Sequence, residues 1–166
     1  MPTAAIGLGA NLPSPAGAPA ETIAAAIERL AELGRIVATS SQYRTAPVGY
    51  LDQPAFINAA ALLETKLAPH ALLHALLEIE RSFGRDRAAS PPKGPRTIDL
   101  DLLLYDDLLL NDPALTLPHP AMHERRFVLA PLREIAPEWR HPVLDRTMTQ
   151  LLAALPMGET VARITG

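Results

Sequence analysis

The sequence contains no cysteine among its 166 residues. Disulfide frameworks, thiolate metal sites and cysteine nucleophiles are therefore excluded. The chain does not need such links, because 48% of its residues are apolar and a domain of this size buries roughly 70% of its unfolded surface. We expect a single compact domain over residues 1–166, with a loosely ordered tail at 156–166.

Long apolar runs and an excess of positive charge are also missing. The formal net charge is −3, so no global basic field would attract nucleic acid or an anionic membrane. The longest apolar stretches, such as 102–105, fall far short of the roughly 20 residues that a membrane span needs. The N-terminal segment lacks the basic start and apolar run of a signal peptide. We therefore expect a cytoplasmic protein that binds neither nucleic acid nor membranes.

Apolar periodicity, interrupted by proline and glycine, predicts intermixed strands and helices. Runs of apolar or β-branched residues predict strands over 4–9, 35–43, 56–67 and 97–105. Helical spacing predicts helices over 21–33, 69–83, 121–134 and 147–155, with Gly34 and Gly84 ending the first two. Residues 108–110 are expected to form a hairpin with the strand before them. Because some strands follow each other too closely for parallel crossovers, the pattern predicts an α+β sandwich with a largely antiparallel sheet.

The most distinctive motif is Arg-Thr-Ile-Asp-Leu-Asp, from Arg96 to Asp101. Alternate side chains of a strand share a face, so Asp99 and Asp101 point the same way, whereas Ile98, Leu100 and Leu102 point into the core. The Cα atoms of the two aspartates would lie about 6.6 Å apart, and the carboxylates repel each other unless they are protonated or bridged by cations. Oxygen ligands favour Mg²⁺, and two such ions suit an in-line displacement at phosphorus. The alternative is that the two aspartates form a solvated strand face.

A basic segment precedes this motif. It contains Arg85, Arg87, Lys93 and Arg96, interrupted by prolines and Gly94. The planar fork of arginine binds phosphate oxygens in pairs, and such a cluster can neutralise a polyphosphate that metal ions hold from the other side. Proline and glycine break regular structure, so the segment is predicted to be a flexible loop that closes over the site and excludes water. The alternative is an exposed basic loop without a special role.

Other motifs carry weaker signals. The Gly-Leu-Gly run at 7–9 lacks the third glycine of a dinucleotide fingerprint, and we expect these glycines to allow close backbone packing. His70 and His74 share a helix face but lack the glutamate and third ligand of a zinc protease, so we expect them to be exposed. Phe56 and Phe127 are two of only three phenylalanines. Core packing is the default interpretation for them, but a pair of aromatic rings can also enclose a flat heterocycle.

Several motifs occur in a characteristic order. They are Arg44-Thr45-x-Pro47, Asn58-Ala59-Ala60, Glu80-x-x-x-Gly84-Arg85-x-Arg87, Gly94-Pro95-Arg96-Thr97-Ile98-Asp99-Leu100-Asp101 and Leu117-Pro118-His119-Pro120. This ordered set resembles the 6-hydroxymethyl-7,8-dihydropterin pyrophosphokinases of folate biosynthesis, and the resemblance runs over residues 4–155. The resemblance implies a ferredoxin-like α+β sandwich, in which helices flank a largely antiparallel sheet and the catalytic loops are flexible.

The resemblance also implies roles for individual residues. Asp99 and Asp101 would bind two Mg²⁺ ions. The residues acting on the phosphates during catalysis would be Arg85, Arg87 and Arg96, together with the aspartate pair. The residues binding the pterin would be Thr45, Pro47, Val48, Phe56, Asn58, Asp99 and Phe127. The residues binding ATP would be Glu80, Arg85, Arg87, Lys93, Arg96, Leu102, Thr116, His119 and Arg125.

The reaction implied by the resemblance is transfer of the β,γ-pyrophosphoryl group of ATP to the hydroxymethyl group of 6-hydroxymethyl-7,8-dihydropterin, with release of AMP. ATP would be the co-substrate, two Mg²⁺ ions the cofactor, and the active form a monomer. One alternative is an ordinary metal-dependent kinase or nucleotide hydrolase. Another is a non-catalytic module that binds Mg-ATP. The nucleotide product separates these readings, because an ordinary kinase leaves ADP.

Overall fold

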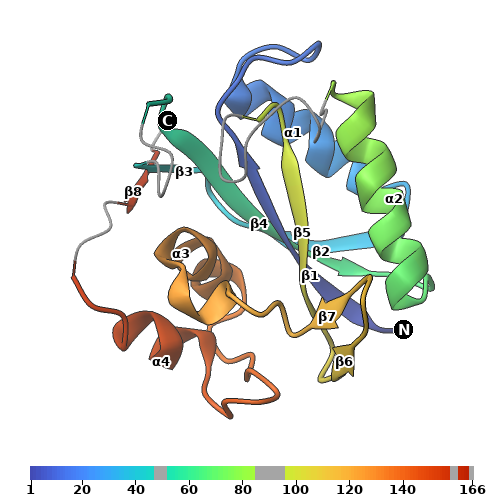
Figure 1. Ribbon diagram of the computed structural model, residues 1–166, viewed down its shortest axis with the longest axis vertical. Helices are drawn as coiled ribbons and strands as arrows, with labels where there is room; N and C mark the ends of the chain where they lie inside the picture. Colours follow the sequence, from blue (N-terminus) through green and yellow to red (C-terminus); the bar gives the residue numbers. More distant parts are fainter. Residues whose placement is uncertain (47–51, 85–95, 158–160, 165–166) are drawn as a thin grey trace.

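The computed structural model describes residues 1–46, 52–84, 96–157 and 161–164. Six of the described strands form one sheet: β1 (Thr3–Ala10), β2 (Arg35–Thr39), β3 (Tyr43–Thr45), β4 (Phe56–Glu64), β5 (Asp99–Tyr105) and β8 (Val161–Arg163). Their order is β5-β1-β4-β3-β8, and β2 also pairs with β4 (Figure 1). Every pairing within this sheet is antiparallel. The prediction of an α+β fold with a largely antiparallel sheet is therefore confirmed.

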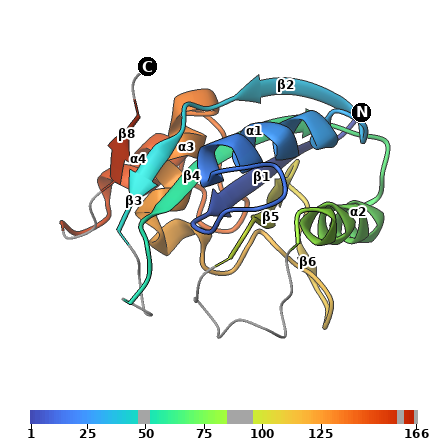
Figure 2. The ribbon, with the colours of Figure 1, turned by 90° about the horizontal axis from the view of Figure 1, so that it is seen from above.

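Helices cover both faces of the sheet, as Figure 1 and Figure 2 show from two directions. One face carries α1 (Pro19–Leu30) and α2 (Pro69–Ser82). The other carries α3 (Arg126–Ile135) and α4 (Met148–Ala153). The connection from β5 to α3 contains a small hairpin, β6 (Leu110–Asn111) with β7 (Thr116–Leu117), and one 3-10 turn, η1 (Met122–Glu124). Within the described ranges, no helix is long and apolar enough to cross a membrane.

The alternation of side chains along β1 separates the two apolar cores. Ile6 and Leu8 pack on the side of α1 and α2, whereas Ala5 packs on the side of α3. Gly7 and Gly9 continue the Ala5 side, because strand residues two apart share a face. Added Cβ atoms would lie 3.3 Å from Leu103 Cδ1 at Gly7 and 2.8 Å from an Asn58 amide nitrogen at Gly9. The two glycines therefore permit close packing, as predicted, and leave the sheet uncovered by side chains here.

The predicted end of the first helix is wrong. α1 ends at Leu30, and Gly34 lies beyond it against β4. A Cβ at Gly34 would come within 2.0 Å of the carbonyl oxygen of Glu64, so the glycine is needed for the close approach of two backbones. Gly84, by contrast, follows α2 with φ of 82°, as expected of a glycine that ends a helix.

The hairpin predicted at 108–110 is also wrong, because β6 pairs with β7 and not with β5. The turn after β5 is held against β1 instead. The backbone N–H of Asp106 donates to the carbonyl oxygen of Thr3 at 2.9 Å, and the backbone N–H of Thr3 donates to Asp106 Oδ1 at 2.9 Å. The chain leaves this turn without returning along β5.

Two further boundaries differ from the prediction. The strand expected over 35–43 is divided into β2 and β3, because both the backbone N–H and the hydroxyl of Ser40 bond to the backbone of Ala60. The helix expected over 121–134 begins as η1 and restarts as α3 after an extended Arg125, with φ of −114° and ψ of 108°. Residues 161–163, within the tail expected at 156–166, form β8, which pairs with the outer edge of β3.

Candidate active site

A cavity of about 290 Å³ opens on the α3 side of the sheet, at the end left uncovered by Gly7 and Gly9. Its lining comes from β1, the ends of β3 and β4, β5 and the start of α3. The predicted site residues that line it are Thr45, Phe56, Asn58, Arg96, Asp99, Asp101, Arg125 and Phe127. Segments far apart in the sequence therefore converge on one cavity of a size suited to a small ligand.

β5 presents the two predicted metal ligands to this cavity. Asp99 pairs with Gly9 and Asp101 pairs with Gly7, so the carboxylates project over the strand that lacks side chains. Leu100, between them, is buried in the opposite core, as the alternation predicts. Its backbone N–H donates to Glu80 Oε2 at 2.7 Å, which ties this part of β5 to α2. The structure thus fixes both aspartates on one face, as predicted.

The electrostatics of the aspartate pair fit a divalent cation. Burial, and next the charge of Asp99, raise the pKa of Asp101 to about 7, against the opposing charges of Arg125 and Arg96. A bound cation stabilises the ionised form of both carboxylates in place of a proton. Two carboxylates supply only part of the coordination of a divalent metal ion, so water and substrate oxygens would complete it. Mg²⁺ is usually bound in this way.

Arg96 connects the acidic end of the cavity to its aromatic wall. Its guanidinium donates from Nη1 to Asp99 Oδ2 at 3.0 Å, and the guanidinium carbon lies 5.5 Å from the centroid of the Phe56 ring. The side chain is only 16% exposed. A partly buried arginine in this position can bind an anionic ligand beside the metal site. Its planar cation also interacts favourably with the neighbouring aromatic ring.

Asn11, which the motifs did not point to, supports the cavity from outside its lining. Its buried side-chain oxygen accepts from the backbone N–H of Arg96 at 2.9 Å. Its amide nitrogen donates to Gln53 Oε1 at 2.8 Å and to the carbonyl oxygen of Pro54 at 3.0 Å. Asn11 therefore anchors the segment before Asp99 and the segment before Phe56 to the end of β1. The available signal was a polar residue that directly follows a buried strand.

The opposite wall of the cavity combines an amide with two aromatic rings. The Thr45 hydroxyl donates to Asn58 Oδ1 at 2.7 Å, which orients the amide across the β3–β4 pair. Phe56 contributes its ring from β4, and Phe127 contributes its ring from α3, with the Arg125 guanidinium carbon 5.7 Å from the Phe127 centroid. Flat aromatic walls beside a fixed polar group suit a planar heterocycle with a hydrogen-bonding edge.

Four predicted nucleotide-binding residues do not line this cavity. Glu80 is buried beneath Leu100, and Leu102 belongs to the core on the side of α1 and α2. Thr116 and His119 line a second cavity of about 470 Å³ between the β6–β7 hairpin and the segment around Val143. Five predicted residues lie outside the described residues: Pro47, Val48, Arg85, Arg87 and Lys93.

The surroundings of His119 favour a neutral imidazole. Burial, and then the charge of Arg125, lower its pKa from the usual value. Its Nδ1 accepts from the backbone N–H of Ala121 at 3.2 Å, so Nε2 carries the proton and can donate to an acceptor. His70 and His74 lie elsewhere, on α2, with side chains 50% and 75% exposed, as predicted.

Known proteins resemble this chain in sequence over most of its length. The family model for 7,8-dihydro-6-hydroxymethylpterin-pyrophosphokinase matches residues 5–137. A 2-amino-4-hydroxy-6-hydroxymethyldihydropteridine pyrophosphokinase from Pseudomonas aeruginosa is 46% identical over 164 residues, which cover 97% of this chain and 96% of the relative. The enzyme of the same name from Methylorubrum extorquens is 46% identical over 140 residues, covering 83% of this chain and 85% of the relative.

A solved structure shares the fold. Wild-type HPPK-DHPS of Plasmodium falciparum superposes with a TM-score of 0.69 at 18% identity. The match covers 92% of this chain but only 44% of that longer chain. The family model and the two bacterial relatives together span the strands and helices that build the cavity. The chain therefore belongs to the 7,8-dihydro-6-hydroxymethylpterin pyrophosphokinase family.

Proposed function

We propose that this chain transfers the β,γ-pyrophosphoryl group of ATP to the hydroxymethyl group of 6-hydroxymethyl-7,8-dihydropterin and releases AMP, as a step of folate biosynthesis. The observation that carries the proposal is that one cavity contains both the aspartate pair and the wall formed by Phe56, Phe127 and Asn58. The two halves of the cavity match the two substrates. The aspartate pair can hold the metal ions that a polyphosphate needs, and the wall of aromatic rings and an amide can bind a flat heterocycle with a polar edge.

The pterin would lie in the part of the cavity between β4 and α3. The rings of Phe56 and Phe127 would stack on it, and the Asn58 amide, oriented by Thr45, would bond to its edge. Pro47 and Val48 would complete this edge. The hydroxymethyl group would then point toward Asp99, because Asn58 and Asp99 pair with Gly9 from opposite sides of β1.

Asp99 and Asp101 would hold two Mg²⁺ ions, for which their oxygen donors are suited. When bound, the ions would neutralise the polyphosphate and make the hydroxymethyl oxygen more nucleophilic. That oxygen would attack the β-phosphorus and lose its proton to solvent, while the bond between the β-phosphorus and the oxygen that bridges it to the α-phosphate breaks and AMP departs with that oxygen. Arg96, next to Asp99, would stabilise the charge that moves onto the phosphate oxygens.

The remaining nucleotide contacts are proposed from the family motifs. Arg125 lines the cavity, and the neutral His119 has a donor available at Nε2. Thr116, Glu80 and Leu102 would lie near the nucleotide or support its site. The basic loop would close over the phosphates through Arg85, Arg87 and Lys93.

We also propose the finer features that the family resemblance implies. The strand order β5-β1-β4-β3, with α1 and α2 on one face, supports a ferredoxin-like sandwich. The enzyme would act as a single domain over residues 1–166, as a monomer and in the cytoplasm. Its partners would be the two small-molecule substrates.

The reaction can be tested by mixing the purified protein with ATP, Mg²⁺ and 6-hydroxymethyl-7,8-dihydropterin and separating the nucleotides. AMP should form only when the pterin is present, in a one-to-one ratio with a pyrophosphorylated pterin. Formation of ADP would instead identify an ordinary kinase. Tight binding of Mg-ATP without any product would identify a non-catalytic module. Removal of Mg²⁺ with a chelator should abolish AMP formation, and added Mg²⁺ should restore it.

Replacement of Gly9 by alanine is expected to raise the KM for the pterin roughly fivefold, with little change in the KM for ATP. The new Cβ would come within 2.8 Å of the Asn58 amide nitrogen and would displace the amide from its bond to Thr45. Steady-state kinetics with each substrate varied in turn measures the two constants.

The matched control is Gly7→Ala. Its Cβ would meet only the flexible end of Leu103, at 3.3 Å, so a smaller effect on the pterin is expected. Equal effects of the two substitutions on the KM for the pterin would argue against an oriented Asn58 amide in pterin binding.

A further inference from the structure

The part of the cavity between β4 and α3, where the pterin is proposed to bind, is here called the pterin pocket. Two of its walls belong to elements that are far apart in the sequence but close in space. β3 carries Thr45, and the first turn of α3 carries Phe127. Glu134 lies seven residues after Phe127 on α3, which is about two helical turns, so both side chains project from the same side of the helix. Glu134 therefore faces β3 at the end of α3 remote from the cavity.

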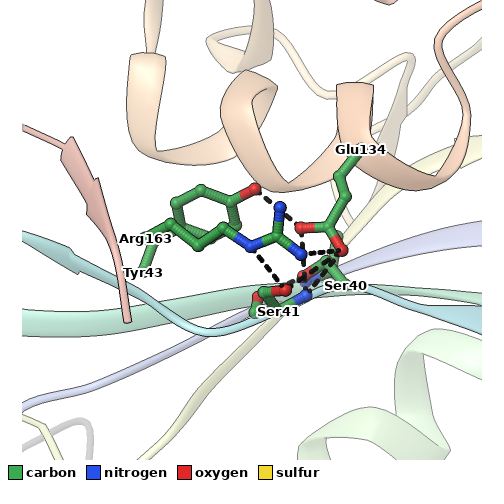
Figure 3. Close-up of polar contacts among 6 residues, drawn as sticks. Ser40, Ser41, Tyr43, Glu134 and Arg163 are labelled. Carbon is green, nitrogen blue, oxygen red and sulfur yellow. Dashed lines mark hydrogen bonds and ion pairs between the residues drawn. The ribbon is translucent and has the colours of Figure 1, made fainter. Parts of the chain in front are cut away.

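The carboxylate of Glu134 binds the segment that leads into β3, as Figure 3 shows. The Tyr43 hydroxyl donates to Glu134 Oε1 at 2.7 Å. The backbone N–H of Ser41 donates to Oε1 and Oε2 at 3.1 and 3.0 Å, and the Ser41 hydroxyl donates to Oε2 at 3.2 Å. One side chain of α3 thus accepts hydrogen bonds from both residues on either side of Gln42.

Tyr43 connects Glu134 to the pocket through β3. Tyr43 and Thr45 are two residues apart on β3 and so share one face of the strand. Both are buried, with 8% and 3% of their surface exposed. Thr45 in turn orients the Asn58 amide. A shift of Tyr43 relative to α3 would therefore move Thr45 relative to Phe127.

The charge of Glu134 strengthens these bonds. Burial raises its pKa, but hydrogen bonds from Tyr43 and Ser41, together with the charge of Arg163, outweigh burial and keep the pKa below the usual value. Glu134 is thus ionised at neutral pH, and hydrogen bonds to a carboxylate are stronger than neutral ones.

Arg163 of β8 adds a weaker contact to the same group. Its Nε donates to the Ser41 hydroxyl oxygen at 2.9 Å, and its Nη2 lies 3.7 Å from Glu134 Oε2. The Arg163 side chain is 57% exposed, so this ion pair contributes little by comparison. Four hydrogen bonds, three from Ser41 and one from Tyr43, thus join Glu134 of α3 to β3 and to the segment just before it.

We propose that Glu134 is a positioning residue that sets the separation of β3 and α3, and thereby holds the Thr45–Asn58 pair and Phe127 in the arrangement that binds the pterin. The inference rests on the proposed function, because it assigns the pterin to this pocket. Glu134 contacts neither substrate. It acts through Tyr43 and Ser41 on the residues that do.

The test compares Glu134→Ala, Glu134→Gln and Tyr43→Phe with the wild type, with Glu138→Ala as an exposed control just beyond α3. Each variant is titrated with the pterin at equilibrium, and the KM for each substrate and kcat are measured. Glu134→Ala is expected to weaken pterin binding roughly tenfold while the KM for ATP changes less than about twofold. Glu134→Gln should recover most of the affinity, because its amide oxygen still accepts from Tyr43 or Ser41.

Tyr43→Phe should weaken pterin binding by about threefold, and the Tyr43→Phe/Glu134→Ala double variant should bind no more weakly than Glu134→Ala alone. A lower melting temperature with an unchanged affinity for the pterin would overturn the proposal and leave Glu134 a purely structural residue. Equal losses of affinity for the pterin and for ATP in Glu134→Ala would also overturn the proposal. If Glu134→Ala does not fold, Tyr43→Phe alone decides by the same criterion. Failure of the wild type to form AMP would instead reject the proposed function.

Discussion

Replacement of Asp101 by asparagine is expected to lower kcat by roughly 10³-fold or more, since a metal ligand of this kind contributes several kcal/mol to the transition state. Asparagine has the same shape as aspartate but no charge, so the cavity keeps its form and loses one of its two carboxylates. The pKa of Asp101 is raised to about 7 by burial and by Asp99, which means that the folded protein tolerates the ionised side chain poorly. The thermal midpoint of Asp101→Asn should therefore equal or exceed that of the wild type.

A substitution that lowers activity without lowering the thermal midpoint identifies a carboxylate that serves function at a cost to stability. The rate of AMP formation and thermal unfolding followed by circular dichroism provide the two measurements. Asp107→Asn is the matched control, because Asp107 is exposed in the turn after β5 and should change neither quantity. Near-normal turnover of Asp101→Asn at saturating Mg²⁺ would rule out the two-metal scheme.

Replacement of Arg96 by alanine is expected to lower kcat by about 10²-fold to 10³-fold, with a smaller loss of affinity for the pterin. Arg96 contacts Asp99 at 3.0 Å and lies over the ring of Phe56. Its removal takes positive charge from the region of the phosphates and also support from one aromatic wall. Arg96→Lys should be intermediate, since lysine keeps the charge but not the planar fork.

Comparison of kcat with an equilibrium titration of the pterin separates the two contributions of Arg96. Arg146→Ala provides the control, because Arg146 is exposed between α3 and α4, far along the chain from the site. A large loss of pterin affinity with normal kcat would assign Arg96 to the heterocycle and not to the phosphates.

Several elements could be predicted because their signals are local. β1, β4, β5 and α2 lie close to their predicted ranges, since apolar runs and a terminal glycine carry enough information over a few residues. The errors have non-local causes. Gly34 is required by the backbone of β4 and does not end a helix, and the turn after β5 is held by β1. The strand β8 pairs with the edge of β3, a partner far from it in the sequence.

The sequence alone determined the chemistry of the acidic pair. Asp99 and Asp101 share a face because strand geometry fixes the direction of alternate side chains, whatever the rest of the fold does. The ordered motifs also predicted the family. The assignments of Pro47, Val48, Arg85, Arg87 and Lys93 stay predictions, since these residues lie outside the described part of the chain.

The tertiary structure alone decided how the pocket is assembled. The pairing of β3 with β4 brings Thr45 to Asn58, and the docking of α3 brings Phe127 to the same cavity. Asn11 and Glu134 acquire their roles only through partners distant in sequence. Burial, which depends on every packed element, also sets the raised pKa of Asp101. Contacts between distant segments depend on how the whole chain packs, so local sequence patterns do not encode them.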